Sequence, residues 1–348
     1  MGSGINEDIL KNIGTHLINY DCNQDELETF IRSVPGSKYR TGIAIKMIDD
    51  LMQQHEKRHM SYHLRALSRI EENMKGIAPY LRDHVSHALM TFLLGIYLYE
   101  NILKENYEVK IDPFQWKLAA LFHDVAYVTE VMHKSNLKYF ANALNTYKEK
   151  YEIDRKSITF KTVPMNLFEL QNNINPLSLI GRRLYNWGIN LDATALFYNM
   201  IDSCDLCHGM LGAVAMLYVI DVLYEKNNPE RQDFFTDEPG WSQDNFTNDI
   251  IPACTAIFLH NLNPNLFGSD NKISLEAAPL AYLLKLSDSL QEWERPSQDN
   301  QQGYSGNLFQ LEINGNKVIL KAGIPEDRKT RIKNELQACI KEQLVVIR

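Results

Sequence analysis

The sequence predicts a mainly α-helical protein with a small β-hairpin and one further helix at its C-terminal end. Two observations predict this fold class. Apolar segments with helical spacing, such as WKLAALF and LEAAPLAYLLKLSDSL, recur between polar connections over most of the chain. Near residue 310 the pattern changes to alternating apolar and polar residues around an Asn-Gly turn, FQLEI-NGN-KVILKAG, which is typical of a hairpin.

Length and composition limit the class of protein. The 348 residues suffice for one large domain with appendages or for two domains, and the 45% hydrophobic and 23% charged residues are typical of a soluble globular protein. The net charge of -8 does not favour a wide nucleic-acid-binding surface. No apolar run approaches the roughly 18 residues of a membrane span, so we expect no membrane partner.

The N-terminus and the cysteines indicate the compartment. MGSGINEDILKNIG has neither a basic start nor a long apolar core, so no signal peptide is expected. The cysteines are few and odd in number, which fits a reducing cytoplasm better than a disulfide framework: Cys22, Cys204, Cys207, Cys254 and Cys339. We therefore expect a cytoplasmic protein, with a homo-oligomer left open.

Residues 1–75 are predicted to form an N-terminal helical extension packed on the core. Its last helix, about 41–75, carries His55, His59 and His63 at four-residue spacing, which would place them on one face and would suit a metal ion. The surrounding segment QQHEKRHMSYH is polar, however, so we interpret this face as solvated.

Residues 76–298 are predicted to form the central helical domain. An apolar helix over 76–103 follows a turn that contains proline, and a second leads into His123 and Asp124. Further helices follow after a mixed polar stretch. Residues 227–249 are rich in Pro, Gly, Asn and Asp and are predicted to form a long surface loop, a feature that is often functional.

Residues 305–348 are predicted to form a ββα unit after the polar linker PSQDNQQGYSG. The two strands flank the Asn-Gly turn. An amphipathic helix over about 325–343 completes the unit.

The stretch LAALFHDVAYVTE places His123 and Asp124 directly after an apolar helical segment. Buried ionisable groups are costly unless they are paired or bind a metal. A cation that accepts one nitrogen and one oxygen ligand would satisfy both side chains. The alternative is a helix-terminal aspartate that happens to have a histidine beside it.

Other helical segments carry the same residue types at apolar positions: His84, His87, His208, His260 and Asp288. Each has a plain interpretation alone, such as a core histidine bonded to a backbone carbonyl. Together, several apolar helices that each present a His or Asp inward would form a histidine–carboxylate cluster, and helix bundles build their metal sites in this way.

The order H…HD…H…H…D on successive helices resembles the HD-domain superfamily of metal-dependent phosphohydrolases. The resemblance covers about residues 76–296 and rests on five segments, RDHVSHALMTFLLG, LAALFHDVAYVTE, CHGMLGAVAML, AIFLHNL and LAYLLKLSDSLQEWERP. It implies an HD-type helical bundle that carries the small C-terminal unit. It also implies a phosphomono- or phosphodiesterase that acts on a small-molecule phosphoester or nucleotide.

The resemblance assigns the metal ligands residue by residue. His87, His123, Asp124 and Asp288 correspond to one metal site, and Asp124 is suited by type to bridge to a second. His208 and His260 match the additional histidines of two-metal members. Imidazole and carboxylate ligation suits Fe, Mn, Ni, Co or Zn and does not choose among them, so the expected cofactor is a pair of divalent transition-metal ions.

The resemblance also implies catalytic roles. His84, one turn before His87, would face the same pocket and donate a proton to the leaving oxygen, as an upstream histidine does in related phosphodiesterases, although the spacing here is three residues and not four. Asp124 would act in the same centre. Lys285 lies about one helical turn before Asp288, and it and Arg82 are candidates for phosphate contacts. A surface or snorkelling charge is an equal alternative for both.

Two other functions remain open. A diiron oxygenase of this superfamily has the same ligand set, and a nucleotide-binding sensor with little turnover would use the same pocket. Cys204-Asp-Leu-Cys207-His208 has the spacing of a haem attachment site, but without an export signal we do not favour haem. The chain also lacks the signature of the branch that hydrolyses cyclic di-GMP.

Overall fold

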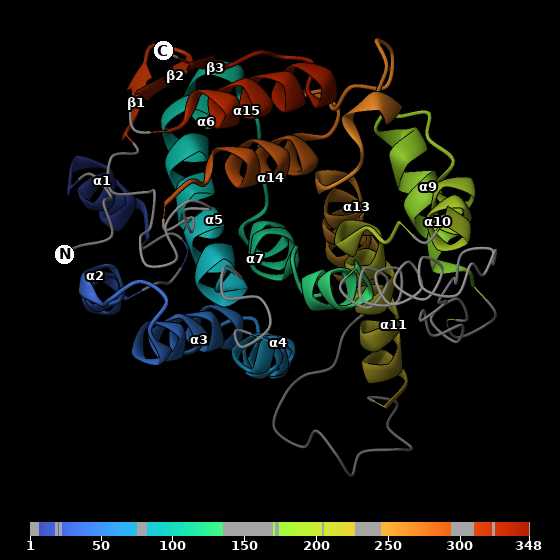
Figure 1. Ribbon diagram of the computed structural model, residues 1–348, viewed down its shortest axis with the longest axis horizontal. Helices are drawn as coiled ribbons and strands as arrows, with labels where there is room; N and C mark the ends of the chain where they lie inside the picture. Colours follow the sequence, from blue (N-terminus) through green and yellow to red (C-terminus); the bar gives the residue numbers. More distant parts are fainter. Residues whose placement is uncertain are drawn as a thin grey trace, which may run out of the picture.

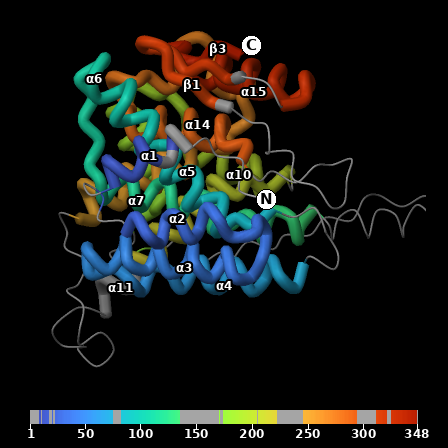
Figure 2. Tube along the Cα trace, turned by 90° about the vertical axis from the view of Figure 1, so that its left-hand side faces the viewer, coloured from blue at the N-terminus to red at the C-terminus, as the bar shows by residue number. Residues whose placement is uncertain are grey.

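The computed structural model describes residues 7–17, 20, 23–74, 82–134, 170, 174–203, 205–226, 245–293, 310–321 and 324–347. Over these residues the protein is mainly α-helical with one small sheet, as predicted (Figure 1). The N-terminal helices form a layer at one side of the molecule, and the C-terminal unit lies at the opposite side (Figure 2). The elements of this layer are α2 (Gln24–Arg32), α3 (Lys38–Gln53), the 3-10 turn η2 (Arg58–Met60) and α4 (Ser61–Met74), and α1 (Glu7–Leu17) lies between the layer and the C-terminal unit.

The central bundle is built around helices that are buried on all sides. Every residue of α5 (His84–Leu98) and of α13 (Ile251–His260) is buried, as expected for helices without a polar face. Their closest partners are α7 (Pro113–Phe122), α11 (His208–Lys226) and α14 (Pro279–Leu290). The remaining elements of this part are η3 (Tyr99–Leu103), α6 (Lys104–Tyr107), α9 (Pro176–Asn186), α10 (Ala193–Ser203), η7 (Phe246–Ile250) and η8 (Pro264–Leu266).

The C-terminal unit has one strand more than predicted. Strands β1 (Gln310–Asn314) and β2 (Lys317–Lys321) pair antiparallel around Gly315, whose φ of 59° suits the turn. Strand β3 (Val345–Ile347) then pairs parallel to β2, so the sheet order is β1-β2-β3. The predicted helix over 325–343 is α15 (Glu326–Cys339), and it ends earlier because the chain must extend to reach β2.

The prediction of one helix over 41–75 is wrong. Helix α3 ends at Gln53, Glu56 adopts a left-handed conformation with φ of 58°, and α4 begins only at Ser61. His55 therefore does not share a face with His63. Its ring stacks on Phe114 of α7 with centroids 4.3 Å apart.

Some predicted elements lie outside the described residues, including most of the stretch 131–180 and residues 227–244 of the predicted loop. Residues 246–249 of that loop are helical and belong to η7, which ends at Ile250. In the described part of the chain, no single helix is long and apolar enough to cross a membrane. Two consecutive helices, Ala193–Ser203 and His208–Asp221, would be long and apolar enough if counted together, but the chain bends between them.

Gly95 of α5 packs directly against Trp116 of α7. A Cβ atom on Gly95 would lie 1.9 Å from Cζ2 of Trp116, whose Nε1 donates a hydrogen bond to the carbonyl of Phe92. Trp116 is fully buried and has no room to move. The close contact of these helices sets the distance between the two parts of the bundle that carry His87 and His123.

Gly95→Ala should destabilise the protein by about 1–3 kcal/mol, because overpacking the core outweighs the higher helix propensity of alanine. Gly42→Ala in α3 is the matched control, since nothing lies within 4 Å of the added Cβ. Denaturant unfolding should show the control to be more stable than wild type by about 0.5–1 kcal/mol. An equal effect of the two substitutions would contradict the close packing.

Candidate metal centre

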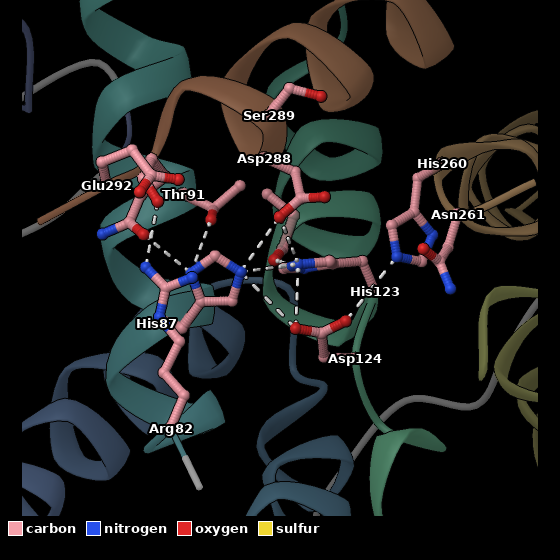
Figure 3. Close-up of polar contacts among 12 residues, drawn as sticks. Arg82, His87, Thr91, His123, Asp124, His260, Asn261, Asp288, Ser289 and Glu292 are labelled. Atoms are coloured by element: carbon pink, nitrogen blue, oxygen red, sulfur yellow. Dashed lines mark hydrogen bonds and ion pairs between the residues drawn. The ribbon is translucent and has the colours of Figure 1, made fainter. Parts of the chain in front are cut away.

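Five elements bring the six predicted ligands together in the middle of the bundle. Figure 3 shows five of them, His87, His123, Asp124, His260 and Asp288. His87 lies in the first turn of α5, and Asp288 lies near the end of α14. The other ligands stand at helix ends: His123 and Asp124 follow α7, His208 begins α11, and His260 ends α13.

The position of His123 and Asp124 follows from the boundaries of α7. Asp112 caps the helix by accepting hydrogen bonds from the amides of Phe114 and Gln115, with Pro113 at the first helical position. The helix ends at Phe122, residues 123–126 form turns, and a new helix follows over 127–134. The break directs both side chains into the bundle instead of along a continuous helix.

One oxygen of Asp124 belongs to a first group of ligands. Oδ2 lies 3.3 Å from Nε2 of His123 and 3.5 Å from Nε2 of His87. Oδ1 of Asp288 completes the group at 3.0 Å from Nε2 of His87 and 3.6 Å from Nε2 of His123.

The other oxygen of Asp124 belongs to a second group. Oδ1 lies 3.0 Å from Nε2 of His208 and 3.6 Å from Nε2 of His260, and these two nitrogens are 3.2 Å apart. Ligand atoms of His87, His123 and Asp124, and likewise those of Asp124, His208 and His260, lie within 4.8 Å of one another. Asp124 is thus common to two adjacent groups that could each hold a metal ion. Ligand atoms of His123, His260 and Asp288 also lie within 4.8 Å of one another, so the two groups are in contact.

Hydrogen bonds orient the four imidazoles in the same way. In each ring Nδ1 faces an acceptor, which favours the tautomer with the proton on Nδ1 and leaves Nε2 as an unprotonated donor for a metal. The acceptors are Gln291 Oε1 for His87 at 2.9 Å, Ala120 O for His123 at 2.9 Å, Glu130 Oε2 for His208 at 2.7 Å and Ile257 O for His260 at 2.6 Å. All four Nε2 atoms point into the cluster.

Burial and neighbouring charges determine the histidine pKa values. Burial lowers the pKa of His87 to about 3, with a smaller contribution from the Arg82 guanidinium. Burial also lowers the pKa of His123, but the carboxylate of Asp124 and then that of Asp288 outweigh it and raise the pKa to about 10. For His208, hydrogen bonds to Asp124 and Glu130 outweigh burial and raise the pKa to about 9.

The carboxylates respond in the opposite direction. Burial raises the pKa of Asp124 and of Asp288, yet the surrounding imidazoles hold both pKa values well below the ordinary range. Two ionised carboxylates in a buried cluster need positive charge, and protons on His123 and His208 supply it. Metal cations would supply the same charge through the same atoms and would release those protons. The donor set therefore fits metal ions.

His84 lies beside the cluster and is held by the N-terminal layer. Glu71 of α4 accepts hydrogen bonds from Nδ1 of His84 and from its backbone amide. The ring of His84 stacks on Tyr127 with centroids 3.8 Å apart, and its centroid lies 6.2 Å from that of His87. His84 and Glu71 are both buried.

The two candidate phosphate-binding cations have structural partners. Nζ of Lys285 is buried, donates to the carbonyl of His260 at 2.7 Å and forms an ion pair with Glu335 of α15. The expectation of a phosphate contact from Lys285 does not fit this position. Arg82 donates to the carbonyls of Gln291 and Trp293, at 3.0 and 3.3 Å, and lies on the His87 side of the centre.

The sequence did not reveal the residues that orient the ligands. Glu71, Glu130 and Gln291 lie in ordinary helical or turn sequence, and nothing distinguishes them from surface residues. Glu130 lies seven residues after His123, in the same stretch of sequence. This proximity was the one sequence feature that pointed to a role of Glu130 at the centre. Cys207 donates from Sγ to the carbonyl of Asn261 at 3.5 Å, and Cys204 lies outside the described residues.

Glu130→Gln should weaken metal binding at the His208–His260 side by about 10–100-fold while the fold is kept. The carboxylate of Glu130 accepts from both Nδ1 and the backbone amide of His208, so a neutral amide would lower the basicity of the ring. Titration of the metal-free protein with manganese should show one weakened and one unchanged step. Two unchanged steps would contradict this role of Glu130.

No protein-family model, curated protein or solved structure matches this chain. The function must therefore be inferred from the geometry of the centre.

Proposed function

We propose that this protein is an HD-type, metal-dependent phosphoester hydrolase that acts on a nucleotide or a related small phosphoester. The observation that supports it most is the position of Asp124, whose two oxygens face two separate groups of ligands. A carboxylate in this position is suited to bridge two cations about 3.5–4 Å apart, the spacing of two-metal phosphoesterases.

One divalent transition-metal ion would be held by His87, His123, Asp124 and Asp288, and a second by Asp124, His208 and His260. Together the ions would stabilise the charge of the phosphoryl group and acidify an attacking water. The protein's own residues orient these ligands. They also exclude bulk water, since all four histidines are buried.

In this proposal His84 donates a proton to the leaving oxygen. Glu71 holds its Nδ1, which leaves Nε2 as the atom that can exchange a proton with substrate. Stacking on Tyr127 fixes the plane of the ring. The N-terminal layer thus contributes to catalysis through Glu71.

His84→Gln should lower kcat by about 10²–10⁴-fold for a substrate with a poor, alkoxide leaving group. The loss should be much smaller for p-nitrophenyl phosphate, because p-nitrophenolate leaves without a proton. Metal content should stay at the wild-type value. An equal loss for both substrates would contradict proton donation by His84.

The proposal is tested by assaying p-nitrophenyl phosphate and bis(p-nitrophenyl) phosphate with protein loaded in turn with Mn, Fe, Co, Ni and Zn. Hydrolysis should be present in wild type, lost in His123→Ala and kept in His59→Ala, a control outside the cluster. Elemental analysis of each sample gives the metal. Iron-dependent oxygen consumption without hydrolysis would instead favour the diiron oxygenase, which shares the ligand set.

A further inference from the structure

The backbone carbonyl of His260 lies at the end of a helix, because His260 is the last residue of α13. The last four carbonyls of a helix have no partner within the helix. Here the partner is a lysine from another helix, since Nζ of Lys285 donates to the carbonyl of His260 at 2.7 Å. Both residues are buried, so the amine satisfies a carbonyl that bulk water does not reach.

The imidazole of His260 is fixed to its own helix. Its Nδ1 faces the carbonyl of Ile257, one turn earlier in α13, at 2.6 Å. The ring also packs against the start of α11, where a Cβ atom on Gly209 would lie 3.1 Å from both Nδ1 and Cε1 of His260. The ring therefore follows the end of α13, and a contact that holds this end also sets the position of Nε2.

Lys285 connects the end of α13 to the helix that carries a ligand of the other group. It precedes Asp288 by three residues in α14. Ligand atoms of Asp288 and His260 lie within 4.8 Å of each other, together with those of His123. One helix thus carries both Asp288 and the amine that holds His260, and this contact fixes the two groups of ligands relative to each other.

Opposite sides of α14 have different partners. Figure 3 shows Asp288 pointing into the cluster and Ser289 pointing away from it. Tyr282, Lys285 and Ser289 follow one another at three- and four-residue spacing, which places them on one face of the helix. This face lies against the C-terminal unit (Figure 1), where Tyr282 donates to the carbonyl of Glu342.

Glu335 of α15 fixes the amine of Lys285. The two side chains form an ion pair, and Glu335 also accepts from Oγ of Ser289 at 3.2 Å. A lysine amine stands on a flexible four-carbon chain, so one acceptor alone would hold it loosely. Acceptors on α13 and α15 together hold it in one place. The C-terminal unit thereby acts on the end of α13 through a single side chain.

We propose that Lys285 is a positioning residue for the second metal ion. Its amine, fixed by Glu335, holds the end of α13 so that Nε2 of His260 stays in place to bind the ion with Asp124 and His208. This inference rests on the two-metal centre of the proposed function. It assigns to the C-terminal unit, through Glu335, a role at that centre.

The contact predicts an effect on one metal site and not on the other. Nδ1 of His87 faces Oε1 of Gln291, and Nδ1 of His123 faces the carbonyl of Ala120. Removal of the Lys285 amine leaves these two contacts in place. It should therefore weaken the site of His208 and His260 alone, whereas a general loosening of α14 would also weaken the site that contains Asp288.

The test is calorimetric titration of the full-length, metal-free protein with manganese, in wild type and in Lys285→Met/Glu335→Leu. Apolar side chains of similar volume often replace a buried ion pair at little cost, so this double variant should stay folded. Its affinity at the site with Asp288 should match wild type, and its affinity at the site with His260 should be lower by about tenfold or more. His260→Ala, which keeps the first site alone, identifies the two steps.

Tyr282→Phe is the matched control. It removes a hydrogen bond between α14 and the C-terminal unit in which no ligand takes part, so both steps should match wild type. Unchanged steps in the double variant, or equal weakening of both, would overturn the proposal, as would a weakened second step in Tyr282→Phe. A wild type that takes up no manganese would overturn the metal centre and this inference with it. Manganese binding without hydrolysis would count against the proposed reaction, and the titrations would still decide the role of Lys285.

Discussion

Asp124→Ala should bind no transition metal under conditions in which wild type binds two ions. Each oxygen of Asp124 faces a different group of histidines, so its removal takes one ligand from both groups at once. Loss of residues that only orient a ligand costs about 10–100-fold in affinity, and loss of a shared ligand should cost more at each site. Hydrolysis should fall to background.

His260→Ala is the matched variant for this prediction. It removes a ligand from the second group alone, so one ion should remain with His87, His123, Asp124 and Asp288. Manganese titration followed by calorimetry should therefore count two sites in wild type, one in His260→Ala and none in Asp124→Ala. Circular dichroism checks that both variants keep their helices. One retained ion in Asp124→Ala would show that Asp124 serves a single site.

Glu335→Ala should destabilise the protein by about 3–5 kcal/mol, the usual cost of leaving a buried charge, here that of Lys285, without its partner. Nζ of Lys285 is fully buried, and without Glu335 the hydrogen-bond partner left to it among the described residues would be the carbonyl of His260. Denaturant unfolding of the metal-free proteins measures the difference without a contribution from bound metal.

The double variant Lys285→Met/Glu335→Leu provides the control for this effect. Apolar side chains of similar volume often replace a buried ion pair at little or no cost, so most of the lost stability should return. Equal destabilisation in the single and double variants would show that the lost stability has another cause than the unpaired charge of Lys285.

The sequence was sufficient to predict the helices that carry the ligands. Periodicity identifies a helix, and a His or Asp within an apolar helix is conspicuous, as with His260 in AIFLHNL. The meeting of His87, His123, Asp124, His208, His260 and Asp288 could be expected because buried polar residues must find partners. That the ligands form two groups, one at each oxygen of Asp124, could be seen only in the structure.

Other features depend on contacts between distant segments and could not be predicted. Lys285 precedes Asp288 by one helical turn, which suggested a shared role, but its partner Glu335 lies 50 residues further along. Glu71 reaches His84 from another helix in the same way. The break between α3 and α4 depends on a left-handed residue, Glu56, which has no strong sequence signal.

The most direct test of the account is an anomalous-difference map from a crystal of the manganese-loaded protein. We predict two peaks about 3.5–4 Å apart, one beside His87, His123 and Asp288 and the other beside His208 and His260, with Asp124 touching both. A single peak, or two peaks of which one lacks Asp124 as a ligand, would contradict the dinuclear centre on which the proposed hydrolysis depends.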